Sequence, residues 1–85
     1  MGTSGIYTIT NANNGKVYIG CTGRFERRWY EHKQALLLGS HCNVHLQYSW
    51  NKYGQDAFEF GILEYLDNLE ELPLAEQFWC GVYQI

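Results

Sequence analysis

The chain has 85 residues, with fourteen aromatic side chains, nine glycines, one proline and three cysteines. This length suits a single domain over residues 1–85, because either half alone would be too short to bury a core. No run of about 20 apolar residues and no basic-then-apolar leader is present, which argues against a membrane span and against export. Three cysteines without a CxxC pair argue against a disulfide framework. We therefore expect a reduced, cytoplasmic protein with free thiols.

The net charge of −3 is unevenly distributed along the chain. All six Lys and Arg residues lie at or before Lys52, where only Glu26 and Glu31 oppose them, so this part carries a net +4. From Tyr53 onward, seven acidic residues and no Lys or Arg give −7. A chain polarised in this way can present a basic face to nucleic acid. Chance clustering in a short chain is an equally good explanation.

Hydrophobic periodicity predicts a small mixed domain. Runs rich in Ile, Val, Tyr and Phe predict strands, and apolar residues three or four apart predict helices. In chain order we expect strands over 5–11 and 16–20, helices over 25–38 and 44–53, a strand over 57–66, and a helical segment after Asn68 that Pro73 interrupts or restarts. The order ββααβα indicates an α/β domain of the α+β type, a three-stranded antiparallel sheet flanked by about three helices.

Capping residues support these boundaries. Side chains that accept hydrogen bonds at helix starts are typical N-caps, and glycine commonly ends a helix. The candidate N-caps are Thr22 and Asn43, the candidate stops are Gly39 and Gly54, and a candidate capping box is formed by Asn68 and Glu71.

The predicted hairpin decides where its two tyrosines lie. An Asn-Gly pair at 14–15 is a strong signal for a tight turn. A two-residue turn at 14–15 and a four-residue loop over 11–14 both put Tyr7 and Tyr18 on one face, because side chains alternate along a strand. The longer loop would place the two tyrosines directly opposite each other.

Three ionisable residues lie on or beside predicted apolar faces. Arg28 neighbours the apolar stripe of the first helix, and His32 lies one turn further on, so both side chains point the same way. That stripe consists of Phe25, Trp29, His32 and Leu36. Glu76 is the only charged residue within 72–83. A carboxylate in such a place needs a cation, a metal or a hydrogen-bond donor, so an Arg28–Glu76 ion pair is one open explanation.

The tripeptides Gly5-Ile6-Tyr7 and Tyr18-Ile19-Gly20, with ten residues between them, resemble the name-giving motifs of the GIY-YIG nuclease family. Phe25–Trp29 with His32 is similar to the family's helix that carries its catalytic arginine, and Glu76 stands where the family keeps its metal-binding glutamate. The segment 46–54 is most similar to phage and intron homing endonucleases. The resemblance spans Gly5 to about Trp79. It implies a metal-dependent endonuclease acting on double-stranded DNA in a prokaryotic or phage-infected cell.

The resemblance implies a role for each matching residue. Tyr7 is the candidate general base, Tyr18 would orient the water or the phosphate, and Arg28 offers a permanently charged fork to phosphate oxygens. His32 could relay a proton or bind phosphate, because histidine titrates near neutrality. His41 matches a histidine near the site of the homing enzymes, although an exposed loop histidine is an equally good interpretation.

Glu76 would hold the metal. Its carboxylate is a hard oxygen ligand suited to one Mg²⁺ (or Mn²⁺) ion that otherwise keeps waters and the DNA phosphate. A zinc site built from His41, Cys42 and His45 is a weaker alternative, because these residues provide three ligands without a fourth. We otherwise interpret His45 as a surface residue, and Cys21 and Cys80 as small hydrophobic residues.

Basic side chains other than the candidate catalytic residues are the expected DNA contacts. They are Lys16, Arg24, Arg27, Lys33 and Lys52. The chain contains no counterpart of the linker and separate DNA-binding region of homing enzymes, so we expect an excised catalytic domain or a minimal nuclease. A fused or separate DNA-binding domain would then supply affinity. Two alternatives share the fold. One is a repair-type nuclease within a larger complex, and the other is a catalytically inactive DNA- or protein-binding module.

Overall fold

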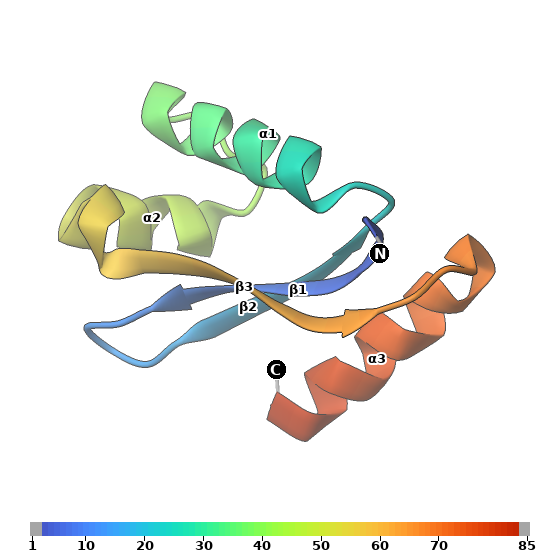
Figure 1. The fold of residues 1–85 in the computed structure, drawn as a ribbon. Coiled ribbons are helices and arrows are strands. Elements are labelled where there is room, and N and C mark those ends of the chain that lie inside the picture. Colours follow the sequence, from blue (N-terminus) through green and yellow to red (C-terminus); the bar gives the residue numbers. More distant parts are fainter. Residues whose placement is uncertain (1–2, 84–85) are drawn as a thin grey trace.

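The computed structural model describes residues 3–83 and places a three-stranded antiparallel sheet between two layers of helices (Figure 1). In chain order the elements are β1 (Gly5–Asn11), β2 (Val17–Thr22), α1 (Phe25–Leu38), α2 (Val44–Tyr53), the 3₁₀ turn η1 (Gln55–Ala57), β3 (Phe58–Tyr65), the 3₁₀ turn η2 (Leu69–Glu71) and α3 (Leu72–Tyr83). The predicted order ββααβα and fold class are confirmed. None of the helices in 3–83 has the length and apolar character needed to cross a bilayer.

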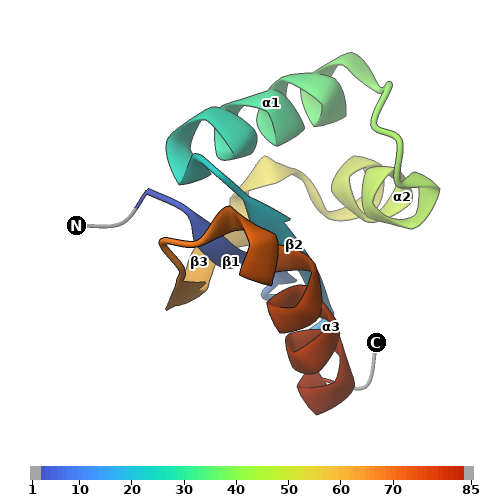
Figure 2. The same cartoon turned by 90° about the vertical axis from the view of Figure 1, so that its right-hand side faces the viewer.

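The central strand is β1, in the order β2-β1-β3. Helices α1 and α2 cover one face of the sheet, and α3 lies on the other, against β2 (Figures 1 and 2). Because side chains alternate along β1, Tyr7 and Ile9 point into the α1–α2 core whereas Ile6 points to the side of α3. The other buried residues of the α1–α2 core are Phe25, Leu36, Leu46, Trp50, Ala57 and Phe58.

Close packing explains the first glycine of the Gly5-Ile6-Tyr7 motif. Gly5 has φ +153, and a Cβ there would lie 2.9 Å from the carbonyl carbon of Glu64 on β3 and 3.0 Å from the Phe25 ring. Ordinary contacts of a Cβ are at least about 3.4 Å long, so only glycine allows β3 and α1 to approach β1 here. This position of the motif is therefore structural.

The hairpin register differs from both predicted turns. Asn11 pairs with Lys16, the loop comprises residues 12–15, and Tyr7 therefore stands opposite Gly20 rather than Tyr18. The reason is Asn11, which is completely buried and whose side-chain oxygen accepts a hydrogen bond from the loop backbone, so it stays in the strand. Tyr7 and Tyr18 share one face as predicted, but as diagonal neighbours.

The end of β2 also differs from the prediction. β2 continues two residues beyond its expected end because Gly5 and Ile6 pair with Thr22 and Cys21. Thr22 is therefore part of the sheet and does not cap α1. Its Oγ1 instead accepts a hydrogen bond from the Arg24 N–H, and Arg24 is the N-cap without using its side chain.

The remaining boundaries follow the sequence more closely. The cap and stops predicted for the two long helices are confirmed at Asn43, Gly39 and Gly54. Asn68 caps the short η2 turn by accepting from the Glu70 N–H, so the predicted capping box with Glu71 is wrong. α3 begins afresh at Leu72, and Pro73 lies in its first turn, where no intrahelical donor is lost.

Candidate active site

A cavity of about 260 Å³ lies where α1, β2, α3 and the loop after α1 meet. Its lining includes every candidate catalytic residue: Tyr7, Tyr18, Arg28, His32, His41 and Glu76. These side chains come from β1, β2, α1, the α1–α2 loop and α3, and thus from both halves of the chain. The fold brings the whole predicted set together.

Gly20 makes room for the Tyr7 ring. A Cβ on Gly20 would lie 2.9 Å from the ring atom Cε2 of Tyr7 and would overlap its Cζ and hydroxyl oxygen still more. With no side chain there, the Tyr7 ring lies across the Gly20 backbone and stacks on its other side against Phe60, with 5.2 Å between ring centroids. The glycine of the second tripeptide therefore positions the tyrosine of the first.

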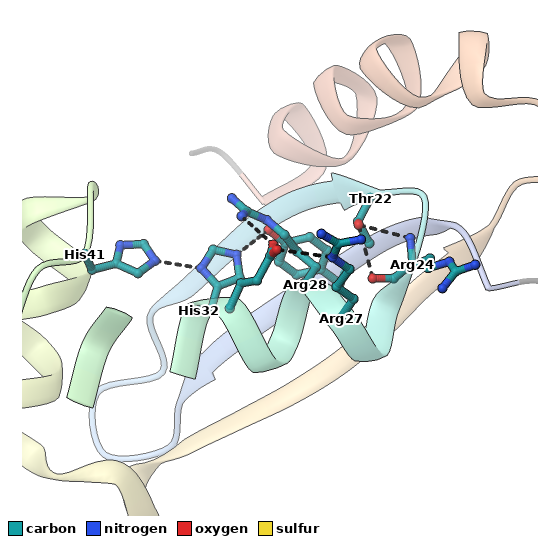
Figure 3. A network of polar contacts seen from close by, with 8 residues as sticks. Thr22, Arg24, Arg27, Arg28, His32 and His41 are labelled. Carbon is teal, nitrogen blue, oxygen red and sulfur yellow. Dashed lines mark hydrogen bonds and ion pairs between the residues drawn. The ribbon is translucent and has the colours of Figure 1, made fainter. Parts of the chain in front are cut away.

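A short hydrogen-bond chain leads away from Tyr7. Its hydroxyl oxygen lies 2.6 Å from Nε2 of His32, and Nδ1 of His32 lies 2.6 Å from Nε2 of His41. Figure 3 shows His32 on α1 with His41 facing it from the loop after the helix. Tyr7 and His32 are both buried, so the contact between them is shielded from water, and the contact between His32 and His41 is part-buried.

Two residues hold His41 in place. The backbone N–H of Asn43 donates to Nδ1 of His41 at 2.9 Å, and the His41 N–H donates to the side-chain oxygen of Gln47 at 3.1 Å. The side-chain nitrogen of the buried Gln47 donates to the carbonyl of Leu36 and to Asn51, both at 3.0 Å. The side-chain oxygen of Gln47 and both of its N–H groups are thus hydrogen-bonded, and these bonds connect the His41 loop to the end of α1 and to α2.

Burial sets the protonation of these groups. It raises the pKa of Tyr7 above its ordinary value, against a lowering by the hydrogen bond and charge of Arg28. Burial, together with the charge of Arg28, lowers the pKa of His32 to about 4 and shifts the pKa of His41 in the same direction. Both imidazoles are therefore neutral at pH 7.

Arg28 lines the cavity from α1 and is partly exposed. Its Nη1 lies 3.4 Å from a carboxylate oxygen of Glu31, which also pairs with Arg27 (Figure 3). Within residues 3–83 the ion-pair partner of Arg28 is Glu31, so the Arg28–Glu76 pair that the sequence left open is not formed. Exposed ion pairs of this kind contribute about 0–1 kcal/mol. Arg28 can therefore exchange Glu31 for a phosphate at little cost.

Glu76 is half-buried, and among the described residues that line the cavity it is the only one with a carboxylate. It lies beside Cys21, and burial together with the charge and hydrogen bond of Glu76 raises the pKa of that thiol. In the described part of the chain, no three His, Cys, Asp or Glu side chains are grouped to hold a metal. Both ring nitrogens of His41 are engaged in hydrogen bonds, so the zinc alternative with Cys42 and His45 is wrong.

Several residues at the site were not singled out for it from the sequence. Gln47 lies one helical turn after the Asn43 cap, and its place at the site follows from its burial in the structure rather than from a sequence pattern. Ser49 on α2 has its hydroxyl 3.4 Å from that of Tyr18, which no sequence pattern indicates. Cys21 directly follows the second tripeptide, and this adjacency could have marked it as a neighbour of the cavity.

The candidate DNA contacts are exposed but dispersed. Arg24 and Arg27 border a second, larger cavity of about 700 Å³ between α1 and β3, whose lining contains none of the candidate catalytic residues. The ammonium of Lys16 lies 5.8 Å from the centre of the Tyr18 ring and is therefore close to the first cavity. Lys33 projects from α1 and Lys52 from the end of α2.

The chain matches a family model and is similar in sequence to two known proteins. A family model described as the GIY-YIG catalytic domain matches residues 3–84. Intron-associated endonuclease 1 of Enterobacteria phage T4 is 44% identical over 77 residues, which cover 89% of this chain and 31% of that protein. Probable intron-encoded endonuclease 1 of Neurospora crassa is 41% identical over 61 residues, covering 72% of this chain and 19% of that protein.

A solved structure is similar as well. The catalytic domain of the homing endonuclease I-TevI superposes with a TM-score of 0.89 at 39% sequence identity, covering 95% of this chain and 88% of the other. The chain thus spans less than a third of the length of the two curated relatives but nearly all of a solved catalytic domain. The chain belongs to the GIY-YIG family of nuclease domains.

Proposed function

We propose that this chain is the catalytic domain of a homing-type endonuclease that hydrolyses phosphodiester bonds of double-stranded DNA with the help of one divalent ion. The observation that carries the proposal is that three chemically different groups line one cavity, the smaller one of about 260 Å³. They are the buried phenol of Tyr7, the guanidinium of Arg28, whose ion pair with Glu31 is exposed and weak, and the carboxylate of Glu76. This is the set of groups that phosphodiester hydrolysis requires.

Tyr7 is the proposed general base. In its phenolate form the hydroxyl oxygen takes a proton from the water that attacks phosphorus, and the bond to the 3′ oxygen then breaks. Arg28 holds the non-bridging phosphate oxygens and lowers the pKa of Tyr7 through its hydrogen bond and charge. Tyr18, the diagonal neighbour of Tyr7, orients the water or the phosphate.

Glu76 is the proposed metal ligand, and the residues present fit this role. Its carboxylate lines the cavity, and within residues 3–83 it has no ion-pair partner that a metal would have to displace. One Mg²⁺ or Mn²⁺ ion bound there would supply positive charge for the scissile phosphate and its leaving oxygen.

The relatives favour the homing branch over the alternatives. The phage T4 and Neurospora crassa relatives are both named as intron endonucleases. An inactive binding module is disfavoured because Tyr7, Arg28 and Glu76 are all retained around one cavity. We further propose that a DNA-binding region outside this chain supplies affinity, and that the protein acts in the cytoplasm of a prokaryotic or phage-infected cell.

Nicking of supercoiled plasmid tests the proposal directly. The chain should nick DNA with Mg²⁺ and not with EDTA, and Glu76→Ala should be inactive. Tyr7→Phe keeps the ring stacked on Phe60 and removes only the hydroxyl, so we expect a loss of about 10²–10⁴-fold. Tyr65→Phe is the matched control, because Tyr65 is 59% exposed and contacts Phe25 through its ring. Metal-independent nicking, or a Tyr7→Phe variant within a few-fold of the parent, would refute these roles.

A further inference from the structure

The hydrogen-bond chain behind Tyr7 has a direction, and a backbone amide sets it. The N–H of Asn43 can only donate, and it donates to Nδ1 of His41 at 2.9 Å. Nδ1 of His41 therefore carries no proton. Since a neutral imidazole has one proton, that proton is on Nε2 of His41.

The proton on Nε2 of His41 determines which nitrogen of His32 is protonated. Nε2–H of His41 faces Nδ1 of His32 at 2.6 Å and must donate to it, so Nδ1 of His32 is an acceptor. The one proton of His32 is consequently on Nε2, which lies 2.6 Å from the hydroxyl oxygen of Tyr7. The Tyr7 oxygen is an acceptor in this bond. Its own proton has to point elsewhere, and the Tyr7 side chain lines the open cavity.

We propose that His41 is a positioning residue. Locked in its Nε2–H form by the Asn43 backbone, it keeps His32 in the form that donates a hydrogen bond to Tyr7. This arrangement favours the phenolate of Tyr7 and directs proton exchange toward the substrate side. The inference rests on the proposed role of Tyr7 as the base. The inference also replaces the expectation that His32 relays a proton. Nε2 of His32 already carries a hydrogen that it donates to Tyr7, so it has no lone pair with which to accept the proton of the Tyr7 hydroxyl.

The surroundings favour this direction over its reverse. In the reverse chain Tyr7 would donate to His32, His32 to His41, and a proton on Nδ1 of His41 would face the N–H of Asn43. Two donors facing each other in a part-buried contact lose a hydrogen bond and leave a polar group unsatisfied. Gln47 also binds the His41 N–H and so prevents the loop from moving away to relieve the clash.

Nuclear magnetic resonance of the histidine rings tests the direction without any assay of activity. We expect the ring ¹⁵N shifts at pH 7 to show the Nε2–H form for both His32 and His41, with a coupling between their facing nitrogens. An Nδ1–H form at either ring would overturn the proposal. A protein that shows both expected forms but does not nick DNA would refute the proposed function and leave the direction of the chain intact.

Cleavage rates of two variants test whether His41 acts as a hydrogen-bond donor. His41→Ala removes the donor and should lower kcat about 10- to 100-fold, as loss of a supporting hydrogen bond commonly does. His41→Gln places an amide N–H near the same position and should recover most of this loss, although glutamine cannot titrate. His45→Ala, an exposed neighbour on α2, is the control. Equal losses in the Ala and Gln variants of His41 would refute the donor role.

Discussion

Lowering the pH should destabilise this protein through His32. The side chain is buried against Tyr7 and His41, and burial together with the nearby charge of Arg28 lowers its pKa to about 4 in the folded state. In the unfolded chain the pKa returns to its ordinary value of about 6.5. As the pH falls, the unfolded chain therefore takes up this proton first.

The size of the effect follows from the two pKa values of His32. One pKa unit corresponds to about 1.4 kcal/mol, so a change from about 6.5 to about 4 corresponds to a total of about 3 kcal/mol. This stability is fully present above pH ~6.5, is lost progressively as the pH falls toward ~4, and shows no further loss from this residue below that. His41 adds a contribution of the same sign, because burial lowers its pKa as well.

Urea unfolding followed by tryptophan fluorescence measures this loss, since Trp50 is buried in the core. The parent should lose about 2–3 kcal/mol of its free energy of unfolding between pH ~7 and pH ~4.5 through His32. His32→Gln does not titrate, so its free energy of unfolding should fall by correspondingly less over the same range. Parallel losses in the two proteins would refute the assignment of a neutral, buried His32.

Three further predictions concern the site and its substrate. Gly20→Ala should displace the Tyr7 ring, lower the free energy of unfolding by about 1–3 kcal/mol and remove most nicking activity, whereas Gly23→Ala, whose Cβ would make only an ordinary contact with Leu69 at 3.8 Å, should do neither; equal thermal melts and rates would contradict this. Arg28→Ala should abolish nicking and change stability by less than about 1 kcal/mol, because its ion pair with Glu31 is exposed and the Tyr7 hydroxyl, which loses Arg28, keeps its hydrogen bond to His32; a collapsed melting curve would instead indicate a structural role. The chain alone should bind unrelated duplexes at micromolar affinity or weaker, with a log–log salt slope of about −3 to −4 in fluorescence anisotropy; nanomolar, sequence-selective binding would reveal a recognition surface that we have not identified.

Local sequence signals determined the elements. The periodicity of Phe25, His32 and Leu36 identified the buried face of α1, and Gly39 and Gly54 ended the two long helices where expected. Such signals succeed because they depend on neighbours within one helical turn. The two tripeptides with Arg28 and Glu76 also indicated the family.

The predictions that failed depend on distant partners. Whether Thr22 caps a helix or extends a strand depends on its pairing with Gly5, seventeen residues earlier. The hairpin register depends on Asn11, which is completely buried in the folded domain and therefore stays in β1, paired with Lys16. A local pattern contains no information about either contact, because propensities at strand and helix ends are weak compared with tertiary packing.

The sequence by itself determined which residue types the site contains, and only the tertiary structure decided how they work together. The need for Gly20 follows from the Tyr7 ring that lies across it, and the direction of the histidine chain follows from the backbone N–H of Asn43. Arg28 pairs with Glu31, three residues further along α1, whereas the alternative partner Glu76 lies on α3, and only the tertiary structure decides whether those two helices bring their side chains together. Hydrogen bonds require atoms within about 3 Å in a suitable orientation, and spacing along the chain does not determine such distances between separate elements.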